Sequence, residues 1–172
     1  MPAADPRKSQ TEDQDEPLSG PFRETFELLR DHIGRSADKT EVRLAENFER
    51  ELTYILLYLF TTLLFMSDRD HDAGPKSDQL TKWSLTELAR RDGHQIGALL
   101  QEYRRRFDIF RNIKLFATTD RVLMNEGSMQ LGRYLTGRDS MLFGTVVSSQ
   151  VAIVIPTLRE ELTRLGSRPQ PT

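Results

Sequence analysis

The sequence predicts an all-α protein, a single-domain bundle of about five helices, and two observations support this fold class. Apolar residues recur every three or four positions along most of the chain, as they do on the buried face of a helix. The segment Leu52–Met66 carries no charge, while charged residues flank it on both sides. As a helix it is about 22 Å long, which is short of the roughly 30 Å core of a bilayer. We therefore expect a central helix that the other helices enclose.

Composition limits the classes of function. The chain has 172 residues, enough for one domain with a sizeable core, and a mean hydropathy of −0.53 is typical of a soluble protein. A net charge of −2 argues against a general binder of polyanions. The absence of cysteine excludes disulfides, thiolate nucleophiles and cysteine metal ligands, and it fits a cytoplasmic location. No charged start followed by an apolar stretch indicates a secretory signal.

The two ends of the chain differ from its centre. Residues 1–19 are rich in proline and acidic side chains and contain almost nothing to bury. Burial there cannot offset the entropy lost on ordering, so they are predicted to form a disordered acidic tail. Residues 167–172 are predicted to be a short disordered tail. The helical bundle domain is then expected over 20–166.

The first predicted helix runs from Pro21 to about Ile33. One side of it carries an apolar stripe at helical spacing, which consists of Phe22, Phe26, Leu29 and Ile33. Gly34 predicts its end, because glycine commonly follows the last turn of a helix.

The second predicted helix begins near Asp38, where Glu41 completes a capping-box pattern three positions later. Its apolar seam alternates spacings of three and four through Ala45, Phe48, Leu52, Ile55, Leu59, Thr62 and Met66. Beyond Tyr54 this helix is apolar nearly all round, so several neighbours or another subunit must cover it. Aspartates, a glycine and a proline within Ser67–Ser77 predict a surface loop.

A second capping-box pattern, Ser84–Glu87, predicts the start of the next helix. Gly93 interrupts the apolar face that follows, and it either dents one long helix or separates two. Thr118–Asp120 predict a break and a new N-cap. The helix after this break is expected to end at Gly137.

The last helix is predicted to start at Asp139 or Ser140 and to end at Gly166. Its segment Ser140–Leu158 carries no charge, and Pro156 is better tolerated in membrane helices than in soluble ones. An alternative to the soluble bundle is therefore a membrane-associated protein in which 52–66 and 140–158 insert as two helices. In that alternative, residues 67–139 form a soluble helical segment on one side.

Few residues of the sequence are candidates for catalysis or metal binding. Each of the three histidines, His32, His71 and His94, lies close to an Arg-Asp pair, but their spacing matches no compact metal motif. No glycine-rich phosphate loop is present, and no nucleophile arrangement stands out. We therefore expect no metal site, no cofactor and no catalytic residues, and the sequence favours a non-enzymatic role.

A second alternative is a DNA-binding regulator. In the segment 84–107, Ala89, Gly93 and Leu99 are spaced as in a helix-turn-helix, although Asp92 and Glu102 occupy positions that are usually apolar. Five basic residues in and after it are candidates for binding an anion or nucleic acid: Arg104, Arg105, Arg106, Arg111 and Lys114.

The function predicted first is that of a helical interaction or assembly protein that self-associates through its most apolar helices. Two helices that are apolar nearly all round leave a surplus of apolar surface, which closed oligomers commonly bury. A homo-oligomer is therefore expected, with a further protein partner possible. The predicted contact residues are Leu52, Ile55, Leu59, Met66, Val147 and Ile153.

Overall fold

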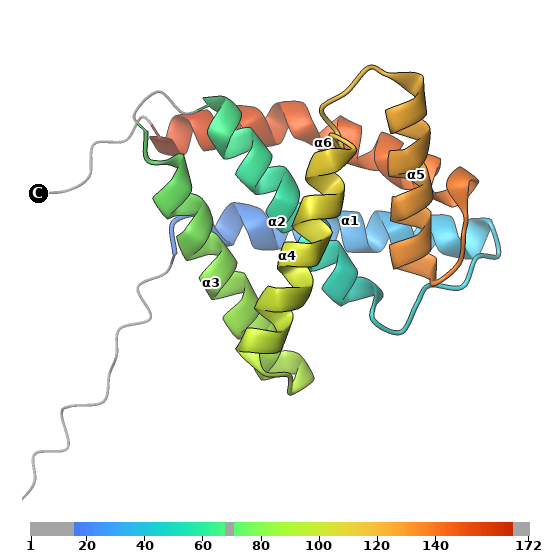
Figure 1. Ribbon diagram of the computed structural model, residues 1–172, viewed down its shortest axis with the longest axis horizontal. Coiled ribbons are helices and arrows are strands. Elements are labelled where there is room, and N and C mark those ends of the chain that lie inside the picture. Colours follow the sequence, from blue (N-terminus) through green and yellow to red (C-terminus); the bar gives the residue numbers. More distant parts are fainter. Residues whose placement is uncertain (1–15, 68–70, 167–172) are drawn as a thin grey trace, which may run out of the picture.

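The computed structural model describes residues 16–67 and 71–166, and these residues form six α-helices without a strand (Figure 1). The helices are α1 (Ser19–Lys39), α2 (Phe48–Ser67), α3 (Ala73–Asp92), α4 (Ile96–Asn112), α5 (Arg121–Thr136) and α6 (Met141–Gly166). The predicted all-α bundle is confirmed. It has six helices where about five were predicted, because Gly93 separates α3 from α4.

Helix α2 lies at the centre, and each of the other five helices packs against it (Figure 1). Every residue from Glu51 to Thr61 is buried, as are Leu63 and Leu64. A helix on the outside of a bundle always turns one face to water, so only the centre can hide a helix that is apolar all round. The prediction of an enclosed central helix is confirmed, and the chain itself covers it.

The outer helices each bury one side. The predicted stripe of α1 is buried at all four positions, Phe22, Phe26, Leu29 and Ile33. Helices α1 and α6 run antiparallel along the long axis of the molecule, with α5 beside the first half of α6 (Figure 1). Helices α3 and α4 pack on each other and on α2. Single apolar stripes are sufficient here because each outer helix needs to cover only part of α2.

The predicted end of the first helix at Gly34 is wrong. Helix α1 continues through this glycine to Lys39 and thereby buries Ala37, which is 3% exposed. The chain leaves the helix only after Thr40, where the amide of Val42 donates to the carbonyl of Ala37 at 2.9 Å. Burial of Ala37 outweighs the modest cost of a glycine inside a helix, which is about 1 kcal/mol.

The predicted start of the second helix is also wrong. Asp38 lies in the last turn of α1, Glu41 has a left-handed backbone with φ of 54°, and α2 begins only at Phe48. Between the helices, the amide of Ala45 donates to the carbonyl of Leu135 in α5 at 2.9 Å. This contact across the fold directs the connection, and the local capping pattern gives no sign of it.

Helix α3 begins earlier than predicted, inside the segment expected to be a loop. Its first residue is Ala73, so Pro75 lies in the first turn, where proline is tolerated because its missing amide has no helical partner. The hydroxyl groups of Thr61 and Ser77 share a hydrogen bond of 2.6 Å that joins the start of α3 to α2. The capping box at Ser84–Glu87 is accordingly wrong, because Ser84 is a buried residue in the middle of α3.

Two other predicted boundaries, at Gly137 and Asp120, are confirmed. At Gly93, where the sequence left open one dented helix or two helices, the structure has two. Gly93 ends α3 in the left-handed conformation, with φ of 71°, and Gly137 ends α5 in the same way. The carboxylate of Asp120 caps α5 by accepting hydrogen bonds from the amides of Val122 and Leu123. In each case the residue has a conformational or bonding property that acts locally.

The N-terminal boundary of the bundle lies before residue 19. Leu18 is 3% exposed, and its amide donates to the carboxylate of Glu16 at 2.9 Å. The prediction that the tail extends to residue 19 is therefore wrong for Glu16–Ser19. The rest of the predicted tails, 1–15 and 167–172, and residues 68–70 of the predicted loop lie outside the described residues.

Candidate functional site

The six residues predicted for a subunit contact fall into two groups. Four are at most 1% exposed because helices of the same chain cover them: Leu52, Ile55, Leu59 and Val147. These four have no surface to offer a partner. Met66 and Ile153 are 63% and 76% exposed. The accessible part of the predicted contact is therefore the end of α2 and the outer side of α6.

Helix α6 carries no charge from Met141 to Leu158, and its two sides differ in exposure. The inner side is buried in the bundle through Phe143, Val147, Val151, Leu158 and Leu162. The outer side exposes apolar and small residues at spacings of three and four, and we call Leu142, Val146, Ser149, Ile153 and Pro156 the α6 outer face. Leu142 is 81% exposed. Such spacing is that of a helix-to-helix seam, yet no element of the described residues covers it.

Close contact with α5 fixes the orientation of α6. A Cβ atom added to Gly144 would stand 1.7 Å from the carbonyl oxygen of Ser128, and one added to Gly132 would stand 2.0 Å from the carbonyl oxygen of Ser140. No real Cβ atom approaches an oxygen so closely, so these two glycines allow backbone to touch backbone. The α6 outer face is consequently held rigidly with respect to the bundle.

A groove of about 360 Å³ borders the α6 outer face, and no charged side chain lines it. Helix α6 contributes one wall through Thr145, Ser149 and Ala152. The start of α5 and the connection before it contribute the other wall, which includes Leu115 and Met124. Exposed Ile153 follows directly after Ala152, so a projecting side chain and a hollow lie next to each other.

Length and composition would allow α6 to cross a membrane, and it is the one helix of this kind in the described part of the chain. Its span Met141–Leu165 has a mean hydropathy of 1.7, and 28% of the apolar window is buried. The other half of the predicted membrane hairpin, 52–66, lies in α2 and is largely enclosed by the bundle. Both helices could enter a bilayer only if α2 left its five neighbours.

The five predicted basic residues do not form one surface. Arg104 and Arg105 are exposed on α4, and Lys114 is exposed after it. Arg111 is exposed and pairs with Asp108 at 3.1 Å. Arg106 turns inward instead. Its position removes one member from the cationic patch that the sequence suggested.

Arg106 binds a buried carboxylate that sequence reasoning missed. Glu51 is 1% exposed, and the guanidinium of Arg106 donates to both of its oxygens at 2.8 and 2.9 Å. The same guanidinium lies 4.1 Å from the centre of the Tyr134 ring. The available signal was spacing: Glu51 precedes Ile55 by four residues and Tyr58 by seven, and both are buried. A residue at that spacing belongs to the enclosed side of the helix.

A second set of polar groups extends from this pair. Glu102 lies 3.6 Å from both Arg50 and Arg106, and it accepts a hydrogen bond of 3.2 Å from the hydroxyl of Tyr54. Burial and the adjacent Glu102 carboxylate raise the pKa of Tyr54 well above its ordinary value. Tyr54 therefore stays protonated and remains a donor. These groups tie α2 to α4.

The helix-turn-helix-like segment 84–107 covers the second half of α3, the turn after Gly93 and most of α4. The two acids at usually apolar positions have partners, since Asp92 pairs with Arg91 at 2.7 Å and Glu102 joins the ion pairs described above. The three histidines lie on α1, before α3 and in the α3–α4 turn. Within the described ranges, no group of three histidine or acidic side chains could hold a metal ion.

A comparison of the chain with protein-family models, with curated proteins and with solved structures finds no match. The function is therefore inferred from the residues and the geometry of this chain.

Proposed function

We propose that the protein is a non-enzymatic assembly protein that forms a closed homodimer through the α6 outer face. The observation that carries this proposal is an uncharged helix side that no element of the described chain covers. Soluble monomers rarely expose long contiguous apolar patches. Apolar area removed from water contributes about 25 cal/mol per Å², and a two-fold dimer is the commonest way to remove it.

An antiparallel pair of α6 helices suits the pattern of residues. With Ser149 of the two copies facing each other at the two-fold axis, Leu142 of one copy faces Pro156 of the other, and Val146 faces Ala152. The small Ser149 at the centre allows the helix axes to come close. Val146 would then enter the groove that Ala152 lines. The same surface thus supplies both the projecting side chains and the hollow, as a two-fold contact requires.

Charges at the two ends of the stripe support the same register. Pairing about Ser149 brings Arg138 near Glu160 of the second copy and Asp139 near its Arg159. All four side chains are exposed in the single chain. The Arg138–Glu160 pair at each end favours this antiparallel arrangement over a parallel one. Asp139 already pairs with Arg133 at 2.7 Å and would have to share that partner, and each exposed pair contributes only about 0–1 kcal/mol.

Two alternatives to the dimer, membrane insertion and DNA binding, are each still supported by one observation. Membrane insertion would now involve α6 alone, because of its length and hydropathy. DNA binding retains the exposed Arg104 and Arg105 but loses Arg106 to Glu51. A DNA-binding protein would show retention on duplex DNA that falls steeply with salt.

Sedimentation of the full chain at low micromolar concentration, without detergent, tests the proposal. We expect a species of twice the 19.9 kDa chain mass. Ile153→Glu should convert it to a monomer, because two carboxylates would be buried at one contact. The matched control is Ile96→Glu, which changes an exposed isoleucine at the start of α4 and should leave the dimer intact.

Three results would overturn the proposal. A wild-type monomer would show that the α6 outer face stays in water. A protein that leaves the membrane pellet only with detergent would favour insertion of α6. If both glutamate variants remain dimeric, the contact lies elsewhere on the surface.

A further inference from the structure

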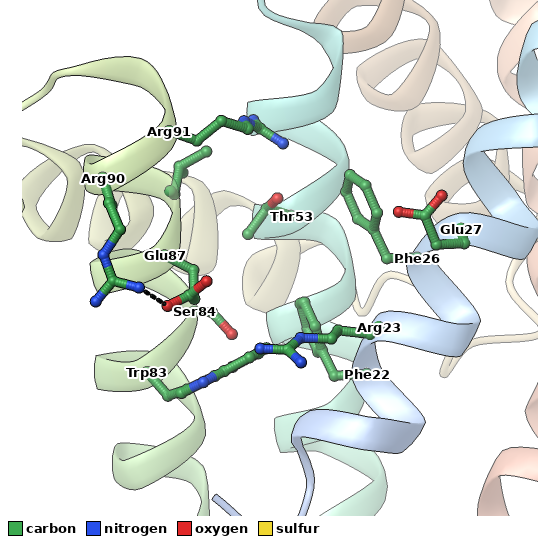
Figure 2. A pocket seen from close by; sticks show the side chains of 11 residues that line it. Phe22, Arg23, Phe26, Glu27, Thr53, Trp83, Ser84, Glu87, Arg90 and Arg91 are labelled. Carbon is green, nitrogen blue, oxygen red and sulfur yellow. Dashed lines mark hydrogen bonds and ion pairs between the residues drawn. The ribbon is translucent and has the colours of Figure 1, made fainter. Parts of the chain in front are cut away.

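A cleft of about 410 Å³ opens between α1 and α3, and no residue of α6 lines it (Figure 2). Polar and charged side chains line most of its rim, and four apolar residues form its apolar part. Phe22 and Phe26 come from α1, and Trp83 and Leu88 come from α3. The rings of Phe22 and Trp83 meet edge to face, 6.1 Å apart. A volume of this size suits a small organic molecule, and mostly apolar walls are usual for such sites.

Ser84 supplies a polar group in this apolar setting. It is 3% exposed, lines the cleft, and its hydroxyl has no hydrogen-bond partner among the described residues. Hydroxyl groups inside helices commonly bond to the carbonyl four residues earlier, as Thr86 does to Lys82 at 2.7 Å and Thr53 does to Glu49 at 2.9 Å. Ser84 does not, although an unpaired buried hydroxyl costs about 1–3 kcal/mol. A ligand in the cleft would provide the missing partner.

Among the described residues that line the cleft, one cation has no ion pair. Arg90 pairs with Glu87 at 2.7 Å, as the dashed line in Figure 2 shows, and Arg91 pairs with Glu49 and Asp92. Glu27 is held by Arg30. Arg23 has no ion pair within the described chain. Its guanidinium lies 4.9 Å from the centre of the Trp83 ring, at the edge of the apolar walls.

We propose that this cleft binds a small organic acid with an apolar body, whose carboxylate is held by Arg23 and whose chain or ring lies against Phe22, Trp83 and Leu88. A guanidinium presents a planar set of donors that matches a carboxylate, and stacking on Trp83 holds it in place. The body of the acid fills the apolar volume, and its carboxylate, with two oxygens, is the one group that can also accept a hydrogen bond from the orphaned hydroxyl of Ser84. Neutral apolar molecules would gain nothing from Arg23, whose exposed guanidinium would then stay in water.

Octanoate is a suitable probe, with octan-1-ol as its uncharged counterpart. Trp83 is the single tryptophan of the chain, so its fluorescence reports occupancy of this cleft alone. Octanoate should change the emission saturably, whereas octan-1-ol should bind at least about tenfold more weakly, because a hydrogen bond to a charged group is worth about 1.5–3 kcal/mol. Calorimetric titration of the full chain gives the same affinities without relying on the emission.

Arg23→Gln should weaken octanoate binding by about tenfold or more, and Arg23→Lys should restore part of it. The matched control is Arg105→Gln, which changes an exposed arginine of α4 outside the cleft and should leave the affinity unchanged. Ser84→Ala should weaken binding while leaving the fold equally or more stable. A structural role for this hydroxyl would instead predict lower stability with unchanged binding, which would overturn its place in the site.

Other outcomes would overturn the proposal as a whole. These are no saturable binding of octanoate, equal binding of octanoate and octan-1-ol, and equal losses in Arg23→Gln and Arg105→Gln. The dimer variant Ile153→Glu should bind octanoate like the wild type, because it lies outside the cleft. Failure of the dimer proposal would therefore leave this one standing, and the reverse also holds.

Discussion

Replacing Gly144 with alanine should destabilise the bundle, although alanine is the better helix former. The added Cβ atom must move from 1.7 Å to at least 3.0 Å from the carbonyl oxygen of Ser128, so α5 and α6 must separate. Overpacking costs about 1–3 kcal/mol, and a clash with backbone belongs at the upper end because no rotamer relieves it. Alanine regains about 1 kcal/mol through helix propensity. We expect a net loss of about 2 kcal/mol.

Urea unfolding followed by circular dichroism measures this change, and Gly34→Ala is its control. Gly34 also lies inside a helix, but a Cβ atom added there meets nothing within 4 Å. This variant should gain about 0.5–1 kcal/mol. The expected changes in the free energy of unfolding therefore have opposite signs in the two alanine variants, because a second helix lies close to Gly144 and none lies close to Gly34.

Gly144→Ala would contradict this prediction if it unfolded at the same urea concentration as the wild type, or at a higher one. Such a result would mean that α5 and α6 do not meet backbone to backbone at this point. A loss of stability in Gly34→Ala would contradict the expectation that helix propensity decides the effect of alanine where no other atoms are close.

Three further predictions concern buried polar and apolar positions. Leu59→Asp places an unpaired carboxylate in the enclosed helix and should cost several kcal/mol, measured by thermal melting. Arg106→Gln should cost about 3 kcal/mol by leaving the Glu51 carboxylate buried alone, while exposed Arg105→Gln should change stability by less than about 0.5 kcal/mol. Burial raises the pKa of Glu16 from 4.5 to about 7, so its contribution is fully present below pH 4.5 and is lost as pH rises through 7. The stability of wild type relative to Glu16→Gln should therefore fall over that range.

Each of these predictions can be contradicted directly. A stable Leu59→Asp protein would mean that α2 is not enclosed. Equal losses in the two arginine variants would remove the special role of the Glu51 pair. A difference between wild type and Glu16→Gln that does not change with pH would show that this carboxyl is open to water.

The sequence by itself determined the centre of the fold. A helix that is apolar all round has one stable place in water, so the enclosure of α2 followed from Leu52–Met66 without any knowledge of its neighbours. It also determined the breaks whose cause is contained in the residue itself. Gly137 adopts a left-handed backbone, and Asp120 bonds to amides two and three positions away. At Gly93 the sequence left open one dented helix or two helices, and the structure has two.

Local signals failed where a contact across the fold competed with them. Gly34 did not end α1 because Ala37 beyond it is buried in the core, and the pattern at Ser84–Glu87 did not begin a helix because α3 was already fixed at Thr61 and Ser77. Helix-start patterns are made of residues that are also acceptable inside helices. The free energy of tertiary packing then decides between the two positions.

Only the tertiary structure decided which side chains are free to act. Arg104, Arg105 and Arg106 are neighbours of one type, yet Arg106 alone faces Glu51, because successive residues on a helix point in different directions. Arg23 and Trp83 meet although sixty positions separate them along the chain. Local periodicity specifies which side of a helix is apolar, but it does not specify which other helix that side will meet.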